Sequence, residues 1–470
     1  MTSLVWFRND LRLRDNTALS EATRGGDSPP IVAVFCVCEK QWRRHDWGDT
    51  KTDFVMRNVA ALAGELAERN VPLKVLRTPT FGDVPGALVK LAKQVEADRL
   101  YFNREYEVNE QRRDEAVTRA CKDVGINVHA LHDQTVVPPD ELRTSDDRYY
   151  KVFTPYRRSW MQRVREKLPL SLRQRPREQG DTGVDNDDVS KVIDDLKLSA
   201  AVRDSWPAGE HEPLRRLRNF VDSRIDDYKS QRDLPAVDGT STLSPYLACG
   251  AISPRQCLDA ALNANGGRID SGKQGPATWI SELVWREFYR HVMVGFPRVS
   301  MDQPFRPEGR NIQWRDDDEA FDAWCEGRTG VPIVDAAMRQ LVRTGWMHNR
   351  LRMIVAMYLT KHLLIDWRRG ERFFMRHLVD GDLANNNGGW QWSALTGTDA
   401  APYFRIFNPY TQGQRFDPDA TFVRRYLPQL SDIDTSVIHE PDKWPALVRG
   451  QVDYPEPIVE HKMARQRAID

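Results

Sequence analysis

Two hydrophobic patterns divide the chain. Over residues 1–132, short runs of β-branched and aromatic residues alternate with amphipathic helical stretches such as 53–70 and 84–97. The runs that we predict to be strands are 4–7, 31–38, 73–76, 100–102 and 126–129. This alternation is typical of a parallel sheet covered by helices. The first pattern therefore predicts an open α/β domain.

The second pattern follows a polar connection. Periodicity fades over residues 133–209, which are rich in charged residues, Pro and Gly, so we predict an extended linker there. From residue 210 to 470, apolar residues recur at helical spacing and strand signals are nearly absent. The predicted helices include 254–262, 277–294, 331–343 and 347–367. We therefore expect an α/β domain joined to an all-α domain through a long linker.

Composition narrows the class of protein. The chain has 470 residues, of which 40% are hydrophobic and 29% are charged, as in ordinary soluble globular proteins. We expect no signal peptide, because charged residues come early, and no membrane span, because no apolar run is long enough. The six cysteines lack metal-type spacing and suggest reduced thiols. We therefore expect a cytoplasmic monomer without a metal site.

The total charge of the chain gives no argument for nucleic-acid binding. The formal net charge is +0 at pH 7, so binding to DNA or RNA would require a local basic patch. The 14 tryptophans permit base stacking or electron transfer, although large cores would explain them equally well. No GxGxxG or GxxxxGK[ST] motif is present. A dinucleotide or nucleoside-triphosphate site in the α/β domain therefore has no direct support.

Residues 345–409 contain many of the charged, amide and aromatic side chains of the helical domain that could bind a ligand. An amphipathic helix pattern is followed by Asp380-Gly-Asp382, by Asn-Asn-Asn-Gly-Gly, which we predict to be a loop, and by Trp390 and Trp392. A helix, a turn and core tryptophans would account for each residue taken alone. Charged, amide and aromatic groups at this density are costly to bury unless a polar, flat ligand lies between them. The segment therefore favours a cofactor site.

Two further clusters are ambiguous by themselves. Residues 239–244 form a small-hydroxyl run before a helix, which suits an anion, although such runs more often cap helices. Trp279, Glu282 and Arg286 fall on one helical face, with Trp285 beside them. This face is equally consistent with an ion pair next to core rings.

Several motifs together resemble the photolyase/cryptochrome family. WMHNRLRM, DGDLANNNGGWQW and TGTDAAPYFRIFNP are similar to the flavin-binding core of class I cyclobutane pyrimidine dimer photolyases. The resemblance runs from VWFRNDLRLRDN at Val5 to DYPEPIVEHK near the end of the chain. It implies FAD in the helical domain and repair of DNA containing cyclobutane pyrimidine dimers. In that repair, light absorbed by FAD drives electron transfer to the flipped-out dimer.

The resemblance also assigns residues to roles. It implies the flavin-binding set Tyr228, Thr240, Ser241, Leu243, Ser244, Trp279, Glu282, Arg286, Asn349, Arg352, Asp380, Asp382 and Asn386. It places at the DNA the set Arg232, Glu282, Trp285, Asn349, Arg350, Met353 and Trp392. The implied catalytic residues are Glu282, Asn349 and Asn386, and the implied electron-transfer chain is Trp390, Trp367 and Trp314. Arg352 and Asp380 are expected to form a buried pair beside the flavin ring.

A cryptochrome photoreceptor on the same scaffold is the alternative function. Asn386 would face the flavin N5, where plant cryptochromes typically have Asp, and it favours a photolyase. Met353 argues against a (6-4) photolyase, a branch that typically has His at this position. An ordinary flavin oxidoreductase would use a nicotinamide donor in the dark, and the sequence offers no fingerprint for one.

The α/β domain is expected to bind a light-harvesting antenna. His45, Asn109 and Glu110 match the positions that bind methenyltetrahydrofolate in related photolyases. A glutamate accepts from the pterin amino group, and an asparagine suits its mixed donor and acceptor edge. The family's lysine and the cysteine before it correspond to Met301 and Ser300. One charge-assisted contact is therefore missing, and we expect folate to bind weakly.

Overall fold

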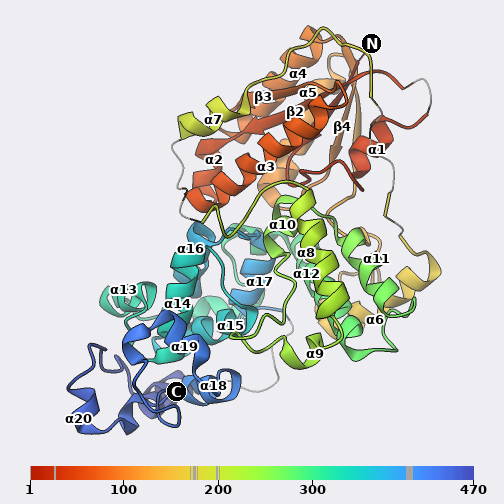
Figure 1. Cartoon of the computed structure of the whole chain (residues 1–470). Coiled ribbons are helices and arrows are strands. Elements are labelled where there is room, and N and C mark those ends of the chain that lie inside the picture. Colours follow the sequence, from red (N-terminus) through yellow and green to blue (C-terminus); the bar gives the residue numbers. More distant parts are fainter. Residues whose placement is uncertain are drawn as a thin grey trace.

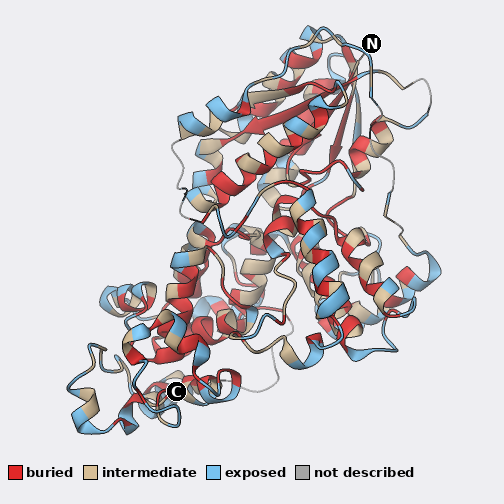
Figure 2. Ribbon diagram, in the orientation of Figure 1, coloured by how far each residue is buried: buried red, intermediate tan, exposed pale blue. Residues whose placement is uncertain are grey.

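The computed structural model describes residues 2–25, 28–169, 171–172, 176, 178–196, 200, 202–398 and 406–469. An α/β domain carries the N-terminus, and a larger helical domain packs against it and carries the C-terminus (Figure 1). Buried residues concentrate in the sheet and in the helices at the centre of the helical domain (Figure 2).

Five parallel strands form a single sheet in the order β3-β2-β1-β4-β5. The strands are Thr2–Phe7 (β1), Ile31–Val37 (β2), Leu73–Arg77 (β3), Ala97–Asn103 (β4) and Asn127–Leu131 (β5). Leu4 in the central strand pairs with Val32 on one side and with Leu100 on the other. Every predicted strand is present, so the α/β prediction is confirmed. The strand order reverses between β1 and β4, whose carboxyl ends form the crevice where open α/β sheets usually bind ligands.

Helices flank the sheet and build the whole second domain (Figure 1). Those of the first domain are Thr17–Ala22 (α1), Glu39–Arg44 (α2), Asp49–Ala67 (α3), Val84–Gln94 (α4) and Val108–Lys122 (α5). Those of the second are His211–Ser223 (α8), Tyr228–Gln231 (α9), Ser244–Cys249 (α10), Pro254–Ala264 (α11), Gln274–Gly295 (α12), Asp318–Glu326 (α13), Pro332–Thr344 (α14), Asn349–Met357 (α15), Trp367–His377 (α16), Leu383–Ala394 (α17), Pro409–Phe416 (α18), Thr421–Tyr426 (α19), Ala446–Arg449 (α20) and His461–Ile469 (α21). In the described part of 210–470 no strand occurs, which confirms the all-α prediction.

The single helix predicted over 347–367 is wrong in its second half. After α15, a π-helical turn follows at Tyr358–His362. Leu364 then adopts a left-handed conformation with φ 54°. Asp366 begins α16 by accepting the amide N–H of Arg368 at 2.9 Å. The reversed backbone and the new N-cap end the helix although the apolar pattern continues.

The loop predicted at 385–389 is also wrong, because these residues form the middle of α17. Asp382 caps this helix by accepting the amide N–H of Asn385 at 3.0 Å. A Cβ on Gly388 would lie 2.1 Å from Cδ1 of Tyr289, so glycine lets α17 approach α12 closely. Asn and Gly favour turns locally, but this packing and the cap outweigh that preference.

The linker over 133–209 is not extended throughout. It contains two helices, Phe153–Glu166 (α6) and Val189–Leu196 (α7), so the prediction is wrong over these stretches. α6 packs against α12, and the indole of its buried Trp160 donates to Glu287 at 2.7 Å. α6 has an apolar stripe at helical spacing, but its many arginines made the segment look like a polar linker.

A buried charge network joins the two domains. Arg12 and Arg255 both pair with Asp133, at 2.6 and 2.8 Å. Gly250, with φ 72°, lets the backbones meet, because a Cβ there would lie 2.1 Å from the carbonyl oxygen of Asn9. Buried ion pairs of this kind require their partners in place. The interface therefore fixes how the sites of the two domains lie relative to one another.

Candidate functional site

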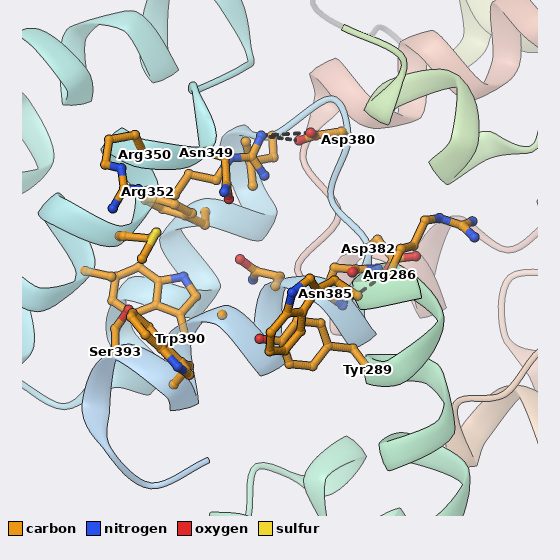
Figure 3. A pocket seen from close by; sticks show the side chains of 18 of the residues that line it. Arg286, Tyr289, Asn349, Arg350, Arg352, Asp380, Asp382, Asn385, Trp390 and Ser393 are labelled. Atoms are coloured by element: carbon orange, nitrogen blue, oxygen red, sulfur yellow. Dashed lines mark hydrogen bonds and ion pairs between the residues drawn. The ribbon is translucent and has the colours of Figure 1, made fainter. Parts of the chain in front are cut away.

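A cavity of about 580 Å³ opens in the helical domain among α12, α15, α16 and α17. Residues that the resemblance implied supply much of its lining: Arg232, Glu282, Trp285, Arg286, Asn349, Arg350, Arg352, Met353, Asp380, Asp382, Asn386, Trp390 and Trp392. Figure 3 shows Arg350, Arg352 and Trp390 on one side of the cavity and Arg286 and Tyr289 on the other. The fold therefore gathers segments that are far apart in the sequence around one space.

Asn386, the residue expected to face the flavin N5, is oriented by α16. Its Nδ2 donates to the backbone carbonyl of Glu371 at 3.0 Å. The Glu371 carboxyl accepts from Asn387 at 3.0 Å, and Asn387 in turn accepts from Gln391 at 2.8 Å. Burial raises the pKa of Glu371 to about 8. The carboxyl is therefore protonated at neutral pH and adds no charge beside the cavity.

Two ion pairs hold the aspartates of the DGD motif. Arg352 donates to both carboxylate oxygens of Asp380, at 2.7 and 3.0 Å, as expected (Figure 3). Arg290 pairs with Asp382. Burial raises the pKa of Asp382, but Arg290 and Arg286 outweigh this effect and bring the pKa to about 2. Asp382 is therefore a stable anion that caps α17 and faces the cavity.

Arg286 is held by backbone groups rather than by a carboxylate. Its guanidinium donates to the carbonyl oxygens of Gln134 and Leu247 at 2.8 and 3.0 Å. Burial, with nearby Arg290, lowers the pKa of Arg286 to about 10. Arg286 remains protonated at neutral pH and brings a fixed positive charge to the cavity wall.

Two partly exposed ion pairs lie where the resemblance places DNA. Arg232 donates to Glu282 at 2.5 Å. Arg350 pairs with Asp233 at 3.0 Å. Because water reaches these side chains, the pairs contribute little to stability and can exchange partners.

Aromatic side chains form the wall beside these pairs. Trp285 stacks on Phe153, with ring centroids 3.5 Å apart and an interplanar angle of 8°. It also meets Phe288 edge to face at 5.8 Å. Met353 and Trp392 line the same cavity. The Trp285 ring is thus held in one orientation, which suits it to stack against a flat ligand.

Six of the implied flavin-binding residues do not line this cavity: Tyr228, Thr240, Ser241, Leu243, Ser244 and Trp279. Tyr228 and Trp279 are buried against Phe220, at centroid distances of 5.8 and 5.1 Å. Ser244 begins the short helix α10, and its hydroxyl accepts the indole N–H of Trp346 at 3.1 Å. These residues group around α8, α9 and α10 instead.

The three predicted electron-transfer tryptophans belong to or pack against one hydrophobic core. Trp390 in the cavity wall is almost fully buried, and α16 touches it, because a Cβ on Gly370 would lie 2.2 Å from its Cη2. Trp367, one turn before Gly370, is fully buried. Trp314 is partly buried and packs against the same core. Trp324, which was not predicted, meets Trp390 edge to face at 6.0 Å.

The three predicted antenna residues meet in the α/β domain. His45 follows α2, whereas Asn109 and Glu110 lie in the first turn of α5. Nδ1 of His45 lies 3.3 Å from Glu110, and Nε2 lies 3.1 Å from Asn109. Ser300 accepts the first amide N–H of α5 at 3.2 Å, and Met301 is 46% exposed. At the position where the family has a lysine, this chain therefore presents a partly exposed thioether and no cation.

Lys51 of α3 connects this antenna cluster with the flavin cavity. Its ammonium donates to the carbonyl oxygen of Gly381 at 2.5 Å and lies 3.4 Å from the ring centre of Trp47. Burial lowers the pKa of Lys51 to about 8, against the attraction of Asp382 and the nearby glutamates, including Glu110. Lys51 is therefore charged at neutral pH and lies between the two sites.

Sequence reasoning missed several members of the site. Tyr289 and Arg290 continue the helical face of Arg286, and that periodicity was sufficient to find them. Glu371 lies in the highly charged stretch WRRGERFF, which is typical of a solvated helix. Only its burial and its contact with Asn387 identify it. Part of the TGTDAAPYFRIFNP motif, residues 399–405, lies outside the described residues.

The cavity fits a flavin. Gly389 faces open space, with no atom within 4 Å of an added Cβ. Buried Nη1 of Arg290 and Nε of Arg350 have no hydrogen-bond partner among the described residues. A large polar ligand with acceptor atoms would satisfy such groups. Over the same residues, no group of His, Cys, Asp and Glu is arranged to hold a metal ion.

Two family models match the chain, one described as DNA photolyase over residues 3–173 and one as FAD binding domain of DNA photolyase over 279–470. The deoxyribodipyrimidine photo-lyase of Salmonella typhimurium is 44% identical over 465 residues, 99% of this chain and 97% of that protein. The chain belongs to the DNA photolyase family. A photo-lyase of the same name from Escherichia coli is 43% identical over 473 residues, 100% of this chain and 98% of that protein.

Solved photolyase structures share the fold. A class III photolyase from Agrobacterium tumefaciens superposes with a TM-score of 0.89 at 35% identity, covering 100% of this chain and 96% of that one. A Synechocystis cryptochrome gives a TM-score of 0.84 at 29% identity, with coverage of 100% and 98%. The fold alone thus does not separate the two functions, whereas the names of the similar curated relatives favour the photolyase. In the described part of this photolyase, no helix has the length and apolar character to span a membrane.

Proposed function

We propose that this photolyase uses light to split cyclobutane pyrimidine dimers in DNA, with FAD bound in the helical-domain cavity. The observation that carries the proposal is the gathering of Glu282, Trp285 and Asn386, from α12 and α17, around one cavity of about 580 Å³. Reduced FAD, when bound and excited by light, supplies the electron that opens the dimer. The residues of the chain bind and orient the two partners and exclude water.

Asn386 presents a fixed, uncharged amide to the flavin N5. The Glu371 carbonyl accepts one N–H of this amide and fixes its orientation, and within the described residues the other N–H and the amide oxygen have no side-chain hydrogen bond. An amide donates to an unprotonated nitrogen and accepts from a protonated one. Asn386 therefore accommodates either form of N5 without adding charge, and the neutral Glu371 behind it preserves this property.

The charged residues of the cavity would hold the rest of the flavin. Arg286 and Arg352 provide positive charge on opposite sides, and each is anchored by protein groups. Asp382 offers a carboxylate that remains ionised, with a pKa of about 2. We propose that Tyr228, Ser244 and their neighbours, grouped at α8 to α10, bind the diphosphate and adenosine parts.

DNA binding would exchange two ion pairs. Phosphates offer Arg232 and Arg350 a stronger partner than a partly exposed carboxylate, which makes affinity depend on salt. Glu282 is then released from Arg232 and becomes free to bind the polar edge of the flipped-out pyrimidines. Trp285, together with Met353 and Trp392, replaces part of the stacking that the dimer loses on leaving the duplex.

Trp390, Trp367 and Trp314 would carry electrons from the surface to oxidised FAD. The indole N–H of buried Trp367 has no hydrogen-bond partner among the described residues. Oxidised Trp367 therefore has no base that takes its proton. Trp314 then reduces it by giving it an electron, and the electron hole moves to Trp314, where water can accept the proton. Trp314→Phe should block photoreduction of oxidised FAD but spare repair by chemically reduced enzyme. Loss of both activities would contradict this separation.

We propose that methenyltetrahydrofolate binds at His45, Asn109 and Glu110. The crevice at the carboxyl end of β1 adjoins this cluster, because Glu110 also lines it, and side chains fill the crevice. Trp42 and Trp47 stack there at 5.1 Å, and the remaining cavity measures about 40 Å³, too small for a second ring system. An antenna would therefore bind at the His45 cluster, on the surface next to Met301.

We also propose that the enzyme acts as a cytoplasmic monomer. The six cysteines are free thiols, which suits a reducing compartment.

The repair assay tests this proposal directly. Protein loaded with FAD and chemically reduced is mixed with a thymine-dimer oligonucleotide and kept in blue light or in the dark. We expect the dimer to disappear only in light. A protein that binds FAD but leaves the dimer intact under light would instead support a cryptochrome-type photoreceptor.

A further inference from the structure

A second cavity, of about 370 Å³, lies in the α/β domain at the carboxyl ends of β4 and β5. Phe102 and Ala130 form its floor; they are register partners on these two strands, so their side chains share one face of the sheet. The small side chain of Ala130 leaves room above it. Gln111 of α5 and Tyr149 also line this cavity. This position at the strand ends is where open α/β sheets bind ligands.

The cavity is distinct from the antenna cluster. Its lining residues on α5 are Gln111, Asp114 and Glu115, which share one helical face. Glu110 lies 3.3 Å from Nδ1 of His45 and does not line the second cavity. The functions proposed above use no residue of the second cavity.

Neutral aromatic groups line much of this cavity. The rings of Tyr106 and His132 are nearly parallel, with centroids 6.0 Å apart, and the phenol oxygen lies 2.9 Å from Nδ1 of His132. Burial lowers the pKa of His132 and raises the pKa of Tyr106, so both are uncharged at neutral pH. The ring of Tyr149 also lines the cavity, and the guanidinium of Arg143 lies 3.4 Å from the centre of this ring. Flat rings and single donors of this kind suit a heteroaromatic ligand.

The charged groups of the cavity disfavour an anion. Arg104 donates through Nε to the Ala130 carbonyl at 3.2 Å, and its two terminal nitrogens make no further bond within the described residues. Glu115 likewise has no ion-pair partner there, and Asp140 lies 3.7 Å from the neutral His132. Among the described lining residues, the two carboxylates without an ion pair, Glu115 and Asp140, thus outnumber the one such guanidinium, that of Arg104. They accept ring and amino N–H groups well but repel a phosphate.

We propose that this cavity binds a neutral, planar heteroaromatic ligand of nucleoside size. Tyr106, His132 and Tyr149 provide the aromatic surface, while Arg104 and Glu115 meet the acceptors and donors of the ring. The volume lies within the range of about 300–1,000 Å³ that is typical of small-molecule sites. A nucleoside meets these requirements, whereas its monophosphate brings a charge that the cavity opposes.

Titration calorimetry of the FAD-loaded protein with adenosine, and separately with AMP, tests the proposal. We expect saturable binding of adenosine and at least about tenfold weaker binding of AMP. Ala130→Met fills the floor and should abolish adenosine binding. Leu131→Met is the matched control, because the next side chain on β5 points to the opposite face of the sheet and should leave binding unchanged.

Light-dependent repair and thermal unfolding show whether Ala130→Met remains folded. If it does not fold, Glu115→Gln replaces it, and this variant should narrow the difference between adenosine and AMP. The proposal is overturned if wild type shows no saturable binding, if folded Ala130→Met binds adenosine as tightly as wild type, or if AMP binds more tightly than adenosine.

Discussion

The flavin cavity and the antenna cluster hold their polar groups in opposite ways. In the cavity, backbone carbonyls outside the lining anchor key side chains: that of Glu371 holds Asn386, and those of Gln134 and Leu247 hold Arg286. In the antenna cluster, His45 contacts Asn109 and Glu110, so the binding groups satisfy one another. A ligand enters the first site without breaking protein contacts but must displace contacts in the second. Preorganisation therefore favours tight binding of flavin over folate.

At the rim of the flavin cavity, as in the antenna cluster, the binding side chains contact one another, whereas those of the cavity interior are anchored by other protein groups. Arg232 and Glu282 bind each other until DNA separates them. This arrangement suits a substrate that must come and go, whereas the anchored interior suits a cofactor that stays bound. The boundary between the two patterns runs along α12, from Glu282 at the rim to Arg290 in the interior.

Gly388→Ala should break the anchored interior. The added methyl group would lie 2.1 Å from Cδ1 of Tyr289, so α17 must move away from α12 and take Asn386 with it. We expect most of the FAD to be lost on purification. The free energy of unfolding should fall by about 1–3 kcal/mol, as for other overpacked cores. Flavin absorbance per protein and thermal unfolding measure both effects.

Gly389→Ala is the matched control for Gly388→Ala. No atom lies within 4 Å of its added Cβ, and alanine is about 1 kcal/mol more favourable than glycine inside a helix. The FAD-free protein should therefore become more stable. Equal destabilisation by the two substitutions would show that contact with Tyr289 does not position α17.

Trp285→Ala tests the exchangeable rim. Stacking contributes about 1–3 kcal/mol per base, so affinity for dimer-containing DNA should fall about 5- to 160-fold. Affinity for undamaged DNA should change little, because phosphate contacts dominate it. Trp285→Phe keeps a stacking surface and should retain most of the affinity. A titration that shows equal losses on both DNAs would assign Trp285 to the core only.

Glu371→Gln tests the neutral support behind Asn386. The pKa of Glu371 rises from 4.5 to about 8 on folding, so the folded state binds more protons between these values. The free energy of unfolding therefore decreases as pH rises through this window, by at most about 1.4 kcal/mol per unit from this group. The variant does not titrate, so its stability should decrease less. Parallel stability curves for the two proteins would contradict a protonated Glu371.

Met301→Lys should give the smallest effect, because the position is 46% exposed and water screens the new charge. We expect folate affinity to rise only a few-fold, in keeping with about 0.2–1 kcal/mol for exposed pairs. Quenching of folate fluorescence by energy transfer to FAD measures the binding. Met301→Gln is the uncharged control. An equal gain in both variants would mean that a missing cation is not the cause of weak binding.

The sequence predicts the parts of this molecule that local pattern determines. The β-branched runs predict all five strands, and the i, i+3, i+7 face predicts that Glu282 and Arg286 share one side of a helix. The run 385–389 does not reveal its helix, because Asn and Gly favour turns and only the contact of Gly388 with Tyr289 reverses that preference.

Residues that act only through tertiary contacts are not visible in the sequence. Glu371 sits among arginines, and its burial depends on α17 packing over α16. Lys51 lies on α3 and contacts Gly381 only because the two domains dock together. The antenna residues were placed by family resemblance, since a histidine and an Asn-Glu pair separated by more than 60 residues carry no local signal.

The central claim is that the helical-domain cavity performs repair and the antenna cluster only delivers light to it. The most direct measurement is the number of thymine dimers repaired per photon absorbed by FAD. It compares folate-free wild type with protein carrying both His45→Ala and Asn109→Ala. We predict equal yields, and added methenyltetrahydrofolate should increase repair per incident photon in wild type alone. A lower yield per flavin-absorbed photon in the double variant would contradict the claim, because it would give the α/β domain a part in the repair step itself.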